Sequence, residues 1–157
     1  MAEQTTMHAR DSVHGSEAKC FVTIEGRRYN FMNLTEFESE DSMNIAEIPI
    51  LGKRGMGHKP AGCNGTWSAT AHYNQSIMRK LALRYRKTGA LPYFEIQVTN
   101  DDPTSTIGRQ TIIHYDCLCE STAVAKFAAG EEVLTEDLSG TYEDWDMPEE
   151  FNELPGM

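Results

Sequence analysis

The spacing of apolar residues predicts strands over most of the chain. Apolar and polar positions alternate over residues 20–24, and the turn residues Glu25-Gly26 lead into a second strand. Residues 34–50 are expected to be extended, although they alternate poorly. Alternation returns over residues 66–73, where one side is apolar and the other polar, as is typical of a strand buried on one face.

One segment, residues 74–89, changes to the period of a helix. Asn74 or Ser76 can cap its start, and Gly89 can close its end. Its apolar stripe consists of Ile77, Met78, Leu81 and Tyr85.

The rest of the chain adds strands without a second unit. Strands are expected at residues 92–100 and 109–119, joined by a loose turn, and at 132–145, whereas the polar residues 1–18 indicate an N-terminal arm. With no internal repeat, residues 1–157 are interpreted as one domain. The predicted fold class is mainly β: an antiparallel β-sandwich or barrel with one flanking α-helix and a long extended hairpin loop.

The hairpin loop is predicted from the glycine-rich sequence GKRGMGHKPAGCNGTW, residues 52–67. Its first glycines have the spacing of a Walker phosphate-binding loop, but His58 stands where that loop requires lysine and Lys59 where it requires serine or threonine. Asn64-Gly65, directly before a strand, is a hairpin-turn signal. We therefore expect residues 44–65 to form an extended, basic hairpin loop.

The net charge of −10 is distributed unevenly. Ten acidic residues and no Lys or Arg follow Lys126, so the whole surplus lies in the last thirty-one residues. Between Ile48 and Phe94 the chain carries eight Lys or Arg and no Asp or Glu. The acidic end is interpreted as a C-terminal arm over residues 142–157.

The sequence gives no support for a catalytic, cofactor or metal site. His58, Cys63 and His72 could be grouped as a thiol nucleophile with bases, but nothing supplies a third orienting group. Cys117 and Cys119 share a predicted strand, yet a zinc site needs about four ligands and no second close pair of Cys or His is present. We expect no enzyme, no cofactor and no metal; a thiol enzyme built on Cys63 and His58 is the alternative.

Targeting signals are likewise not apparent. No apolar run approaches the roughly 20 residues of a membrane span, and the N-terminus lacks the basic-then-apolar order of a signal peptide. We expect synthesis in the cytoplasm, no membrane anchor, and four cysteines present as free thiols.

Opposite charges at two separate places indicate self-assembly. If the basic loop of one copy meets the acidic end of the next, the contact is head-to-tail and generates rings or filaments. Two alternatives stay open: two solvated patches on a monomer, and a small nucleic-acid-binding domain that uses the basic region 53–87, against which the net charge of −10 argues. The candidate assembly residues are Lys53, Arg54, His58, Lys59, Asp144, Asp146, Glu149 and Glu150.

A set of short motifs occurs in a specific order. They are Gly-x-Arg-x-x-Gly-His-Lys at residues 52–59, Gly62-x-x-Gly65-Thr66, the sequence PYFEIQ, and the acidic aromatic segment 142–151. In order and spacing, over about residues 13–151, the chain resembles the tail tube proteins of contractile phages, defective prophages and phage-tail-like bacteriocins. Trp67 departs from the family pattern, which favours a small residue there, and Cys63 interrupts the loop.

The resemblance implies a virion structural protein, a subunit that self-assembles into stacked hexameric rings and so forms the inner tube of a contractile tail or bacteriocin. Strands of neighbouring β-sandwich subunits would join around a lumen, while the hairpin loop and chain ends grip adjacent subunits and rings. The implied partners are the tail sheath, baseplate and tape-measure proteins, with DNA passing through the lumen without specific binding. The implied location is the host bacterial cytoplasm, then the phage tail or bacteriocin particle.

Overall fold

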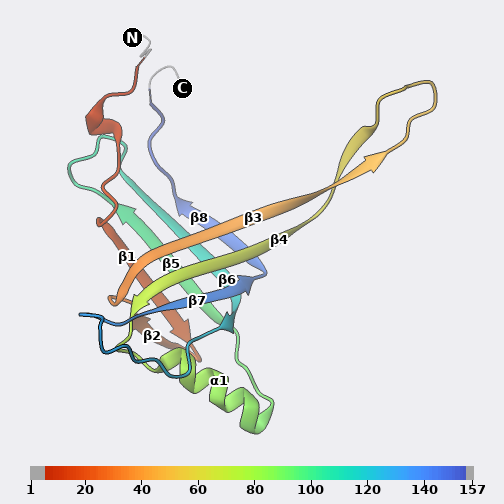
Figure 1. Cartoon of the computed structure of the whole chain (residues 1–157). Helices are drawn as coiled ribbons and strands as arrows, with labels where there is room; N and C mark the ends of the chain where they lie inside the picture. The colour runs from red at the N-terminus through yellow and green to blue at the C-terminus, as the bar shows by residue number, and fades with distance from the viewer. Residues whose placement is uncertain (1–5, 155–157) are drawn as a thin grey trace.

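Figure 1 shows the computed structural model of the chain, which describes residues 6–154. A strongly bent antiparallel sheet forms two layers, and one helix lies at an end of them. The helical elements are a short 3₁₀ turn at Ala9–Asp11 and α1 at Ile77–Thr88. The strands are β1 (Ala18–Ile24), β2 (Arg27–Asn30), β3 (Leu34–Ile48), β4 (Gly57–His72), β5 (Phe94–Asp101), β6 (Arg109–Ser121), β7 (Thr135–Tyr142) and β8 (Asp144–Glu149).

Strand β6 passes from one layer to the other. The strand order is β2-β1-β5-β6-β7-β4-β3, and β8 also pairs with β6. The first part of β6 pairs with β5 and β8, and the part from Leu118 onward pairs with β7. At the change Asp116 has a φ of 53°, and a bulge of this kind bends a strand. The predicted mainly β, antiparallel fold with one flanking helix is confirmed.

The turn between β1 and β2 follows directly from its sequence. Glu25 and Gly26 both have positive φ, 50° and 79°. Two successive positive φ angles give a tight hairpin turn that matches the right-handed twist of the paired strands, and glycine adopts such an angle without steric cost. The predicted turn at Glu25-Gly26 is therefore confirmed.

Helix α1 begins after Ser76 and ends at Gly89, as the spacing predicted. Gly89 has a φ of 73°, and its N–H donates to the carbonyl of Tyr85 over 2.8 Å, which closes the last turn. The buried stripe is narrower than expected. Met78 and Leu81 are buried, but the side chain of Tyr85 is 55% exposed.

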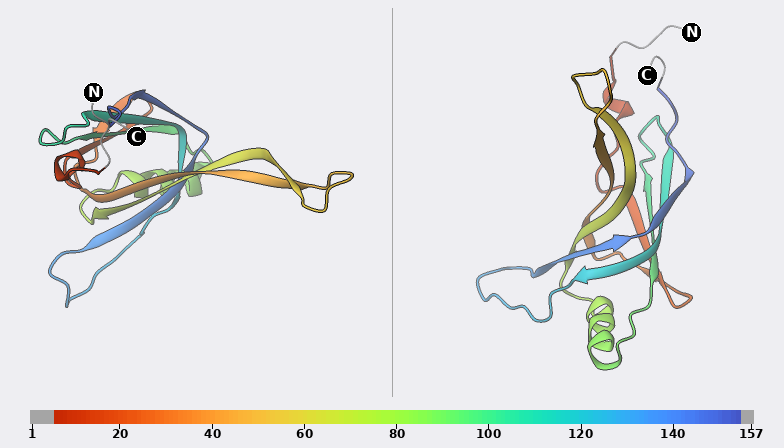
Figure 2. Two further views of the ribbon diagram at one scale, coloured as in Figure 1. Left: turned by 90° about the horizontal axis from the view of Figure 1, so that it is seen from above. Right: turned by 90° about the vertical axis from the view of Figure 1, so that its right-hand side faces the viewer.

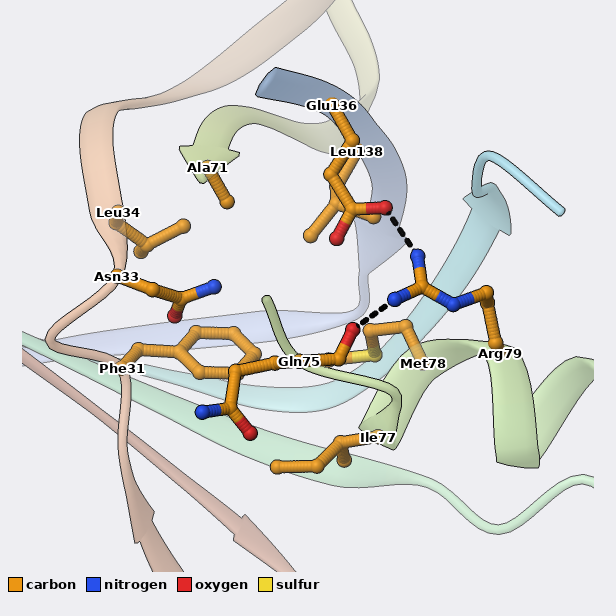
Figure 3. Close-up of a pocket in the computed structure, with 10 residues that line it drawn as sticks. All are labelled: Phe31, Asn33, Leu34, Ala71, Gln75, Ile77, Met78, Arg79, Glu136 and Leu138. Atoms are coloured by element: carbon orange, nitrogen blue, oxygen red, sulfur yellow. Dashed lines mark hydrogen bonds and ion pairs between the residues drawn. The ribbon is translucent and has the colours of Figure 1, made fainter. Parts of the chain in front are cut away.

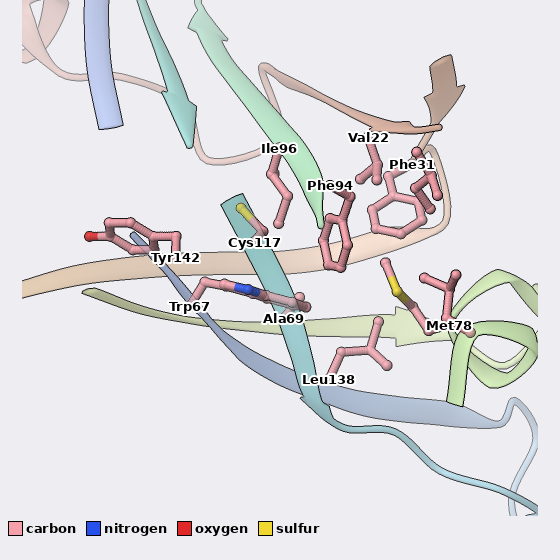
Figure 4. Packing of buried hydrophobic residues seen from close by; sticks show 12 residues of the cluster. Val22, Phe31, Trp67, Ala69, Met78, Phe94, Ile96, Cys117, Leu138 and Tyr142 are labelled. Atoms are coloured by element: carbon pink, nitrogen blue, oxygen red, sulfur yellow. The ribbon is translucent and has the colours of Figure 1, made fainter. Parts of the chain in front are cut away.

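The core lies between the two layers (Figure 4). Val22 and Phe94 of one layer face Trp67 and Leu138 of the other. Trp67 is 2% exposed, and the space that it needs is supplied by its cross-strand partner Gly140, where a Cβ atom would meet the indole. A large residue at position 67 is thus balanced by a small one on β7.

One histidine is buried between the layers. His114 is 2% exposed, and its Nδ1–H donates to the carbonyl of Ile96 over 3.1 Å. Because the neutral ring then accepts at Nε2, the hydroxyl of Ser39 donates to it over 2.9 Å. Burial lowers the pKa of His114 below its usual 6.5.

The N-terminal segment is attached to the domain from residue 8 onward. Asp11 is buried and accepts a 2.6 Å hydrogen bond from the hydroxyl of Thr106. Asp102 accepts from the hydroxyl and N–H of Thr104 and from the N–H of His14, and these hydrogen bonds lower the pKa of its carboxyl. The arm predicted over residues 1–18 is thus anchored in its described part, and residues 1–5 lie outside the described residues.

Candidate assembly surfaces

The hairpin of β3 and β4 extends well beyond the two layers (Figure 2). The two strands pair along almost their whole length, whereas β7 pairs with β4 only from Gly65 onward. Residues 42–64, called the ribbon below, therefore have no third strand of the described chain beside them. The sequence predicted a loop over 44–65. In the structure that region is mostly paired strand, and only residues 49–56 lie outside the strands.

Glycine shapes the tip of the ribbon at one position in particular. The N–H of Lys53 donates to the carbonyl of Ile50 over 3.1 Å and closes a turn. Gly52 occupies the third position of this turn with a φ of 85°, which a residue with a side chain adopts only with strain. The glycine-rich stretch therefore serves the geometry of the ribbon.

The cationic candidates all lie at the outer part of the ribbon. Lys53 and Arg54 are in the loop, and His58 and Lys59 are near the start of β4. All four are exposed, and none forms an ion pair within residues 6–154. Their side chains are available to another molecule.

The acidic candidates lie on and just after β8. Asp144 and Asp146 each accept a 2.8 Å hydrogen bond from the N–H of the following residue. Glu149 accepts from Nε of Arg109 over 2.7 Å, and Glu150 follows the strand as an exposed residue. Every residue of β8 is exposed, so these carboxylates are open to solvent.

The C-terminal region does not begin as a free arm at residue 142. Tyr142 is part of the core at 6% exposed, and β8 pairs with β6 of its own subunit. The indole N–H of Trp145 also donates to a carboxylate oxygen of Asp41 over 2.9 Å, which ties β8 to β3. Within the arm expected over 142–157, residues 144–149 form a strand paired with β6, and residues 155–157 lie outside the described residues.

The structure does not bring the cationic and acidic candidates together within one subunit. They lie on different elements, and the ion pairs of the described residues involve neither group with the other. Those pairs are Arg79 with Glu136, Arg84 with Glu25, and Arg109 with Glu149. A contact between the two groups therefore requires a second copy.

The basic region 53–87 also does not form one surface. Its first cations are on the ribbon, and the others are on α1 at the opposite end of the molecule (Figures 1 and 2). Two of the helix cations are already engaged, Arg79 with Glu136 and Arg84 with Glu25. A continuous basic groove for nucleic acid is not formed by these residues.

One further surface was not predicted from the sequence patterns. The outer face of the β3-β4-β7 layer carries hydroxyl and carboxylate side chains, and it forms an open groove of about 280 Å³ lined by Glu36, Ser68, Ala69, Thr70, Ser121, Asp137, Leu138 and Ser139. The hydroxyl of Thr70 donates to Asp137 over 3.1 Å. In the sequence, Glu36, Glu38 and Glu40 occupy alternate positions of β3, and this spacing could have predicted the carboxylate face.

The candidate thiol and histidine residues are too far apart to act together. His58 and Cys63 are five positions apart on β4, about 16 Å along a strand, and His72 lies at its other end. Cys117 is fully buried, and residues 6–154 contain no group of three or more His, Cys, Asp or Glu that could hold a metal ion. Nothing in this geometry assembles a nucleophile with a base.

A small, partly open pocket lies where α1 meets the sheet (Figure 3). Its volume is about 10 Å³, which is at most enough for one water molecule. Beside it, Arg79 of α1 forms a 2.5 Å ion pair with the buried Glu136 and also donates to the carbonyl of Gln75. The pocket is a packing feature of the helix attachment and has no room for a ligand.

Within the described part of the chain, no helix has the length and apolar character needed to cross a bilayer. The exposed features that distinguish the molecule are the ribbon, the hydroxyl and carboxylate face, and the acidic strand β8.

Comparison with known proteins agrees with this geometry. A family model described as phage tail tube protein matches residues 5–149. The chain is 32% identical over 147 residues to the phage-like element PBSX protein XkdM of Bacillus subtilis (strain 168), which covers 94% of this chain and 97% of that protein.

Two solved structures share the fold at low identity. A chain from the anti-feeding prophage baseplate has a TM-score of 0.64 at 12% identity and covers 94% of this chain and 97% of its own. A chain from the PVC sheath-tube complex in the extended state has a TM-score of 0.62 at 10% identity, covering 82% and 87%. With the family match over nearly its whole length, the chain belongs to the phage tail tube protein family.

Proposed function

We propose that this chain is the structural subunit of the inner tube of a contractile phage tail or phage-tail-like bacteriocin, assembled as stacked hexameric rings around a central conduit. Family membership supports the tube. The observation that carries the proposal is a layer with two open edges and one hydrophilic face.

The open edges belong to the layer β6-β7-β4-β3. Among the described strands, β3 is the last at one side, and at the other side the end of β6, residues 118–121, pairs only with β7. Unpaired strand edges bind other strands, and joining them between copies until the ring closes removes every edge. We infer that β3 of one subunit lies beside the end of β6 of the next.

The hydrophilic face of the same layer suits the inside of a conduit. Its carboxylates, Glu36, Glu38, Glu40 and Asp137, stand among Ser and Thr hydroxyls on paired strands, without a Lys or Arg between them. A negative, wetted wall repels the phosphates of DNA and so lets a nucleic acid pass without binding. Such a conduit is passive and needs no catalytic group.

The ribbon and the acidic strand provide contacts between copies. The cations Lys53, Arg54 and Lys59 have no partner ion within their own subunit's described residues, and β8 of a neighbour offers Asp144, Asp146 and Glu150. Complementary charges of this kind mainly steer the approach and set the register of an interface. Tail sheath, baseplate and tape-measure proteins are the further partners of such a tube, within the tail particle made in a bacterial host.

Electron microscopy of the concentrated protein tests the proposal. Wild-type protein is expected to form rings or tubes, and the triple variant Lys53→Glu, Arg54→Glu, Lys59→Glu is expected to stay unassembled with an unchanged thermal unfolding temperature. A triple variant with the same charge change on α1, Lys80→Glu, Arg86→Glu, Lys87→Glu, is the matched control. Salt-sensitive DNA binding by a monomer, lost in Arg84→Glu, Arg86→Glu, Lys87→Glu, would instead support the nucleic-acid alternative.

A further inference from the structure

The inner side of β3 continues past the end of the core. Phe37 stacks with Trp67, and Ser39 bonds to His114, so odd-numbered residues of β3 point between the layers. Because side chains alternate along a strand, Met43 and Ile45 continue this side into the ribbon. There the opposite layer has ended, and nothing in the described chain covers them.

The two sides of the ribbon differ in polarity next to the core, at residues 42–45 and their partners. Further out, Glu47 and His58 pair on the side of Met43, and Ile48 lies on the other side. Met43 pairs with Cys63 and Ile45 with Pro60 across the strands, and these four residues form an apolar face. Met43 is 69% and Ile45 is 55% exposed, while Cys63 and Pro60 are also exposed. The other side carries Ser42, Asn44 and Asn64. A sheet that is buried on one face shows the same two-sided pattern, but the apolar face of the ribbon is not covered by a core.

A second apolar surface projects from the other side of the molecule. The loop between β6 and β7, residues 122–134, extends away from the ribbon in each view (Figures 1 and 2). Phe127 is 92%, Val124 80% and Val133 62% exposed. Two different surfaces on opposite sides of one subunit are what a repeated head-to-tail contact requires.

We propose that the apolar face of the ribbon, Met43, Ile45, Pro60 and Cys63, packs against loop 122–134 of a second copy of this chain, and that this burial supplies the affinity between adjacent subunits. The inference rests on the proposed tube function. It adds that the cations at the tip steer the approach, whereas removal of apolar surface from water holds the subunits together. The strand registers place the ribbon beyond one end of the layer and loop 122–134 beyond the other, so this contact joins copies displaced along the strand direction.

Two substitutions on neighbouring residues of β3 separate the faces. Met43→Asp places a charge on the apolar face, and Ser42→Asp places the same charge on the polar face one residue away. We expect the concentration needed for assembly to rise about tenfold or more for Met43→Asp and for Phe127→Asp, and to stay close to the wild-type value for Ser42→Asp. All of these residues lie outside the core, so the three variants should unfold at the wild-type temperature.

The outcomes distinguish this inference from the proposed function. Assembly of Met43→Asp or Phe127→Asp at the wild-type concentration, or equal failure of Ser42→Asp, overturns the apolar contact while wild-type tubes still support the function. If the wild-type protein forms no tubes at any concentration, the proposed function fails and the contact fails with it.

The exposed thiol on the apolar face gives a readout without a charge change. A maleimide reagent should label Cys63 in the free subunit, and labelling should be slowed at least about tenfold in assembled tubes because the neighbour covers it. A cysteine on the polar face, introduced as Ser42→Cys in a Cys63→Ser background, should react alike in both forms. Equal labelling of Cys63 before and after assembly would contradict the proposal.

Discussion

Tyr142 of β7 lies across Gly65 of β4, and its hydroxyl donates a 2.9 Å hydrogen bond to the carbonyl of Glu40 on β3. A Cβ atom at Gly65 would meet the tyrosine ring. The reverse arrangement occurs two residues along, where Trp67 of β4 lies across Gly140 of β7. These pairs fasten three strands at the point where the ribbon leaves the core.

The first prediction concerns this aromatic and glycine pair. Gly65→Ala should lower the free energy of unfolding by about 1–3 kcal/mol, because the added methyl displaces the ring of Tyr142. Tyr142→Phe should lower it by about 1 kcal/mol through loss of the hydrogen bond to Glu40. Chemical denaturation measures both. Gly130→Ala, where a Cβ meets nothing within 4 Å, is the control, and a Gly65→Ala protein as stable as the control would contradict the prediction.

Acidification should destabilise the fold through His114. Burial lowers the pKa of this imidazole in the folded protein, so as the pH falls below the usual 6.5 the unfolded chain binds a proton that the folded chain does not. The free energy of unfolding should therefore decrease with falling pH, by up to about 1.4 kcal/mol per pH unit, until the folded pKa is reached.

Denaturation curves measured from neutral pH to about pH 5 give this slope. His114→Gln should be less stable at neutral pH. Its free energy of unfolding should also depend less on pH, because the contribution of this imidazole to the slope is lost. His72→Gln, which changes an exposed imidazole, should keep it. A slope unaltered by His114→Gln would show that another group is responsible.

The attachment of α1 should depend on its partly buried ion pair. Arg79→Met leaves the carboxylate of Glu136, 5% exposed, without its ion partner and should cost about 3 kcal/mol of unfolding free energy. The double variant Arg79→Met, Glu136→Leu should recover most of that loss because no buried charge remains.

An exposed ion pair on the same helix provides the comparison. Arg84 and Glu25 are about half exposed, at 46% and 53%, so Arg84→Ala should change the unfolding free energy by less than about 1 kcal/mol. Equal effects of Arg79→Met and Arg84→Ala would show that burial of Glu136 has no energetic consequence.

The four cysteines should differ in reactivity. Burial raises the pKa of Cys20 and of Cys117 to about 12 and that of Cys119 to about 11, whereas Cys63 is exposed. Since the thiolate is the reactive form, the folded free subunit should react with a thiol reagent at one cysteine, and the unfolded chain at four. Cys63→Ser should remove the fast reaction. An unusually fast reaction at Cys63 would instead favour the thiol-enzyme alternative.

Local signals explain what the sequence predicted well. The turn at Glu25-Gly26 and the end of α1 at Gly89 depend on glycines at those positions, whereas Ser76 precedes α1 without a side-chain cap hydrogen bond. The regular alternation of residues 66–73 likewise reflects one buried face. Each of these elements was found because its cause lies within a few residues.

Distant partners explain what the sequence did not predict. Strand β8 is exposed along its whole length and contains Pro148, so burial gives it no one-sided pattern, and it pairs with an edge of the distant strand β6. The sequence did not predict that β4 begins at Gly57, because glycines usually indicate a loop. This segment is a strand because it pairs with β3. The buried site of His114 depends on Ser39, seventy-five residues away.

Both described ends of the chain are held by one loop. The N–H of Thr106 donates to the carbonyl of Arg10 over 3.0 Å, and the N–H of Asn152 donates to the carbonyl of Ile107 over 2.7 Å. This loop lies at the end of the molecule away from α1 (Figure 1). In the proposed tube, a bulky protein fused to either terminus would therefore crowd the same end of each subunit.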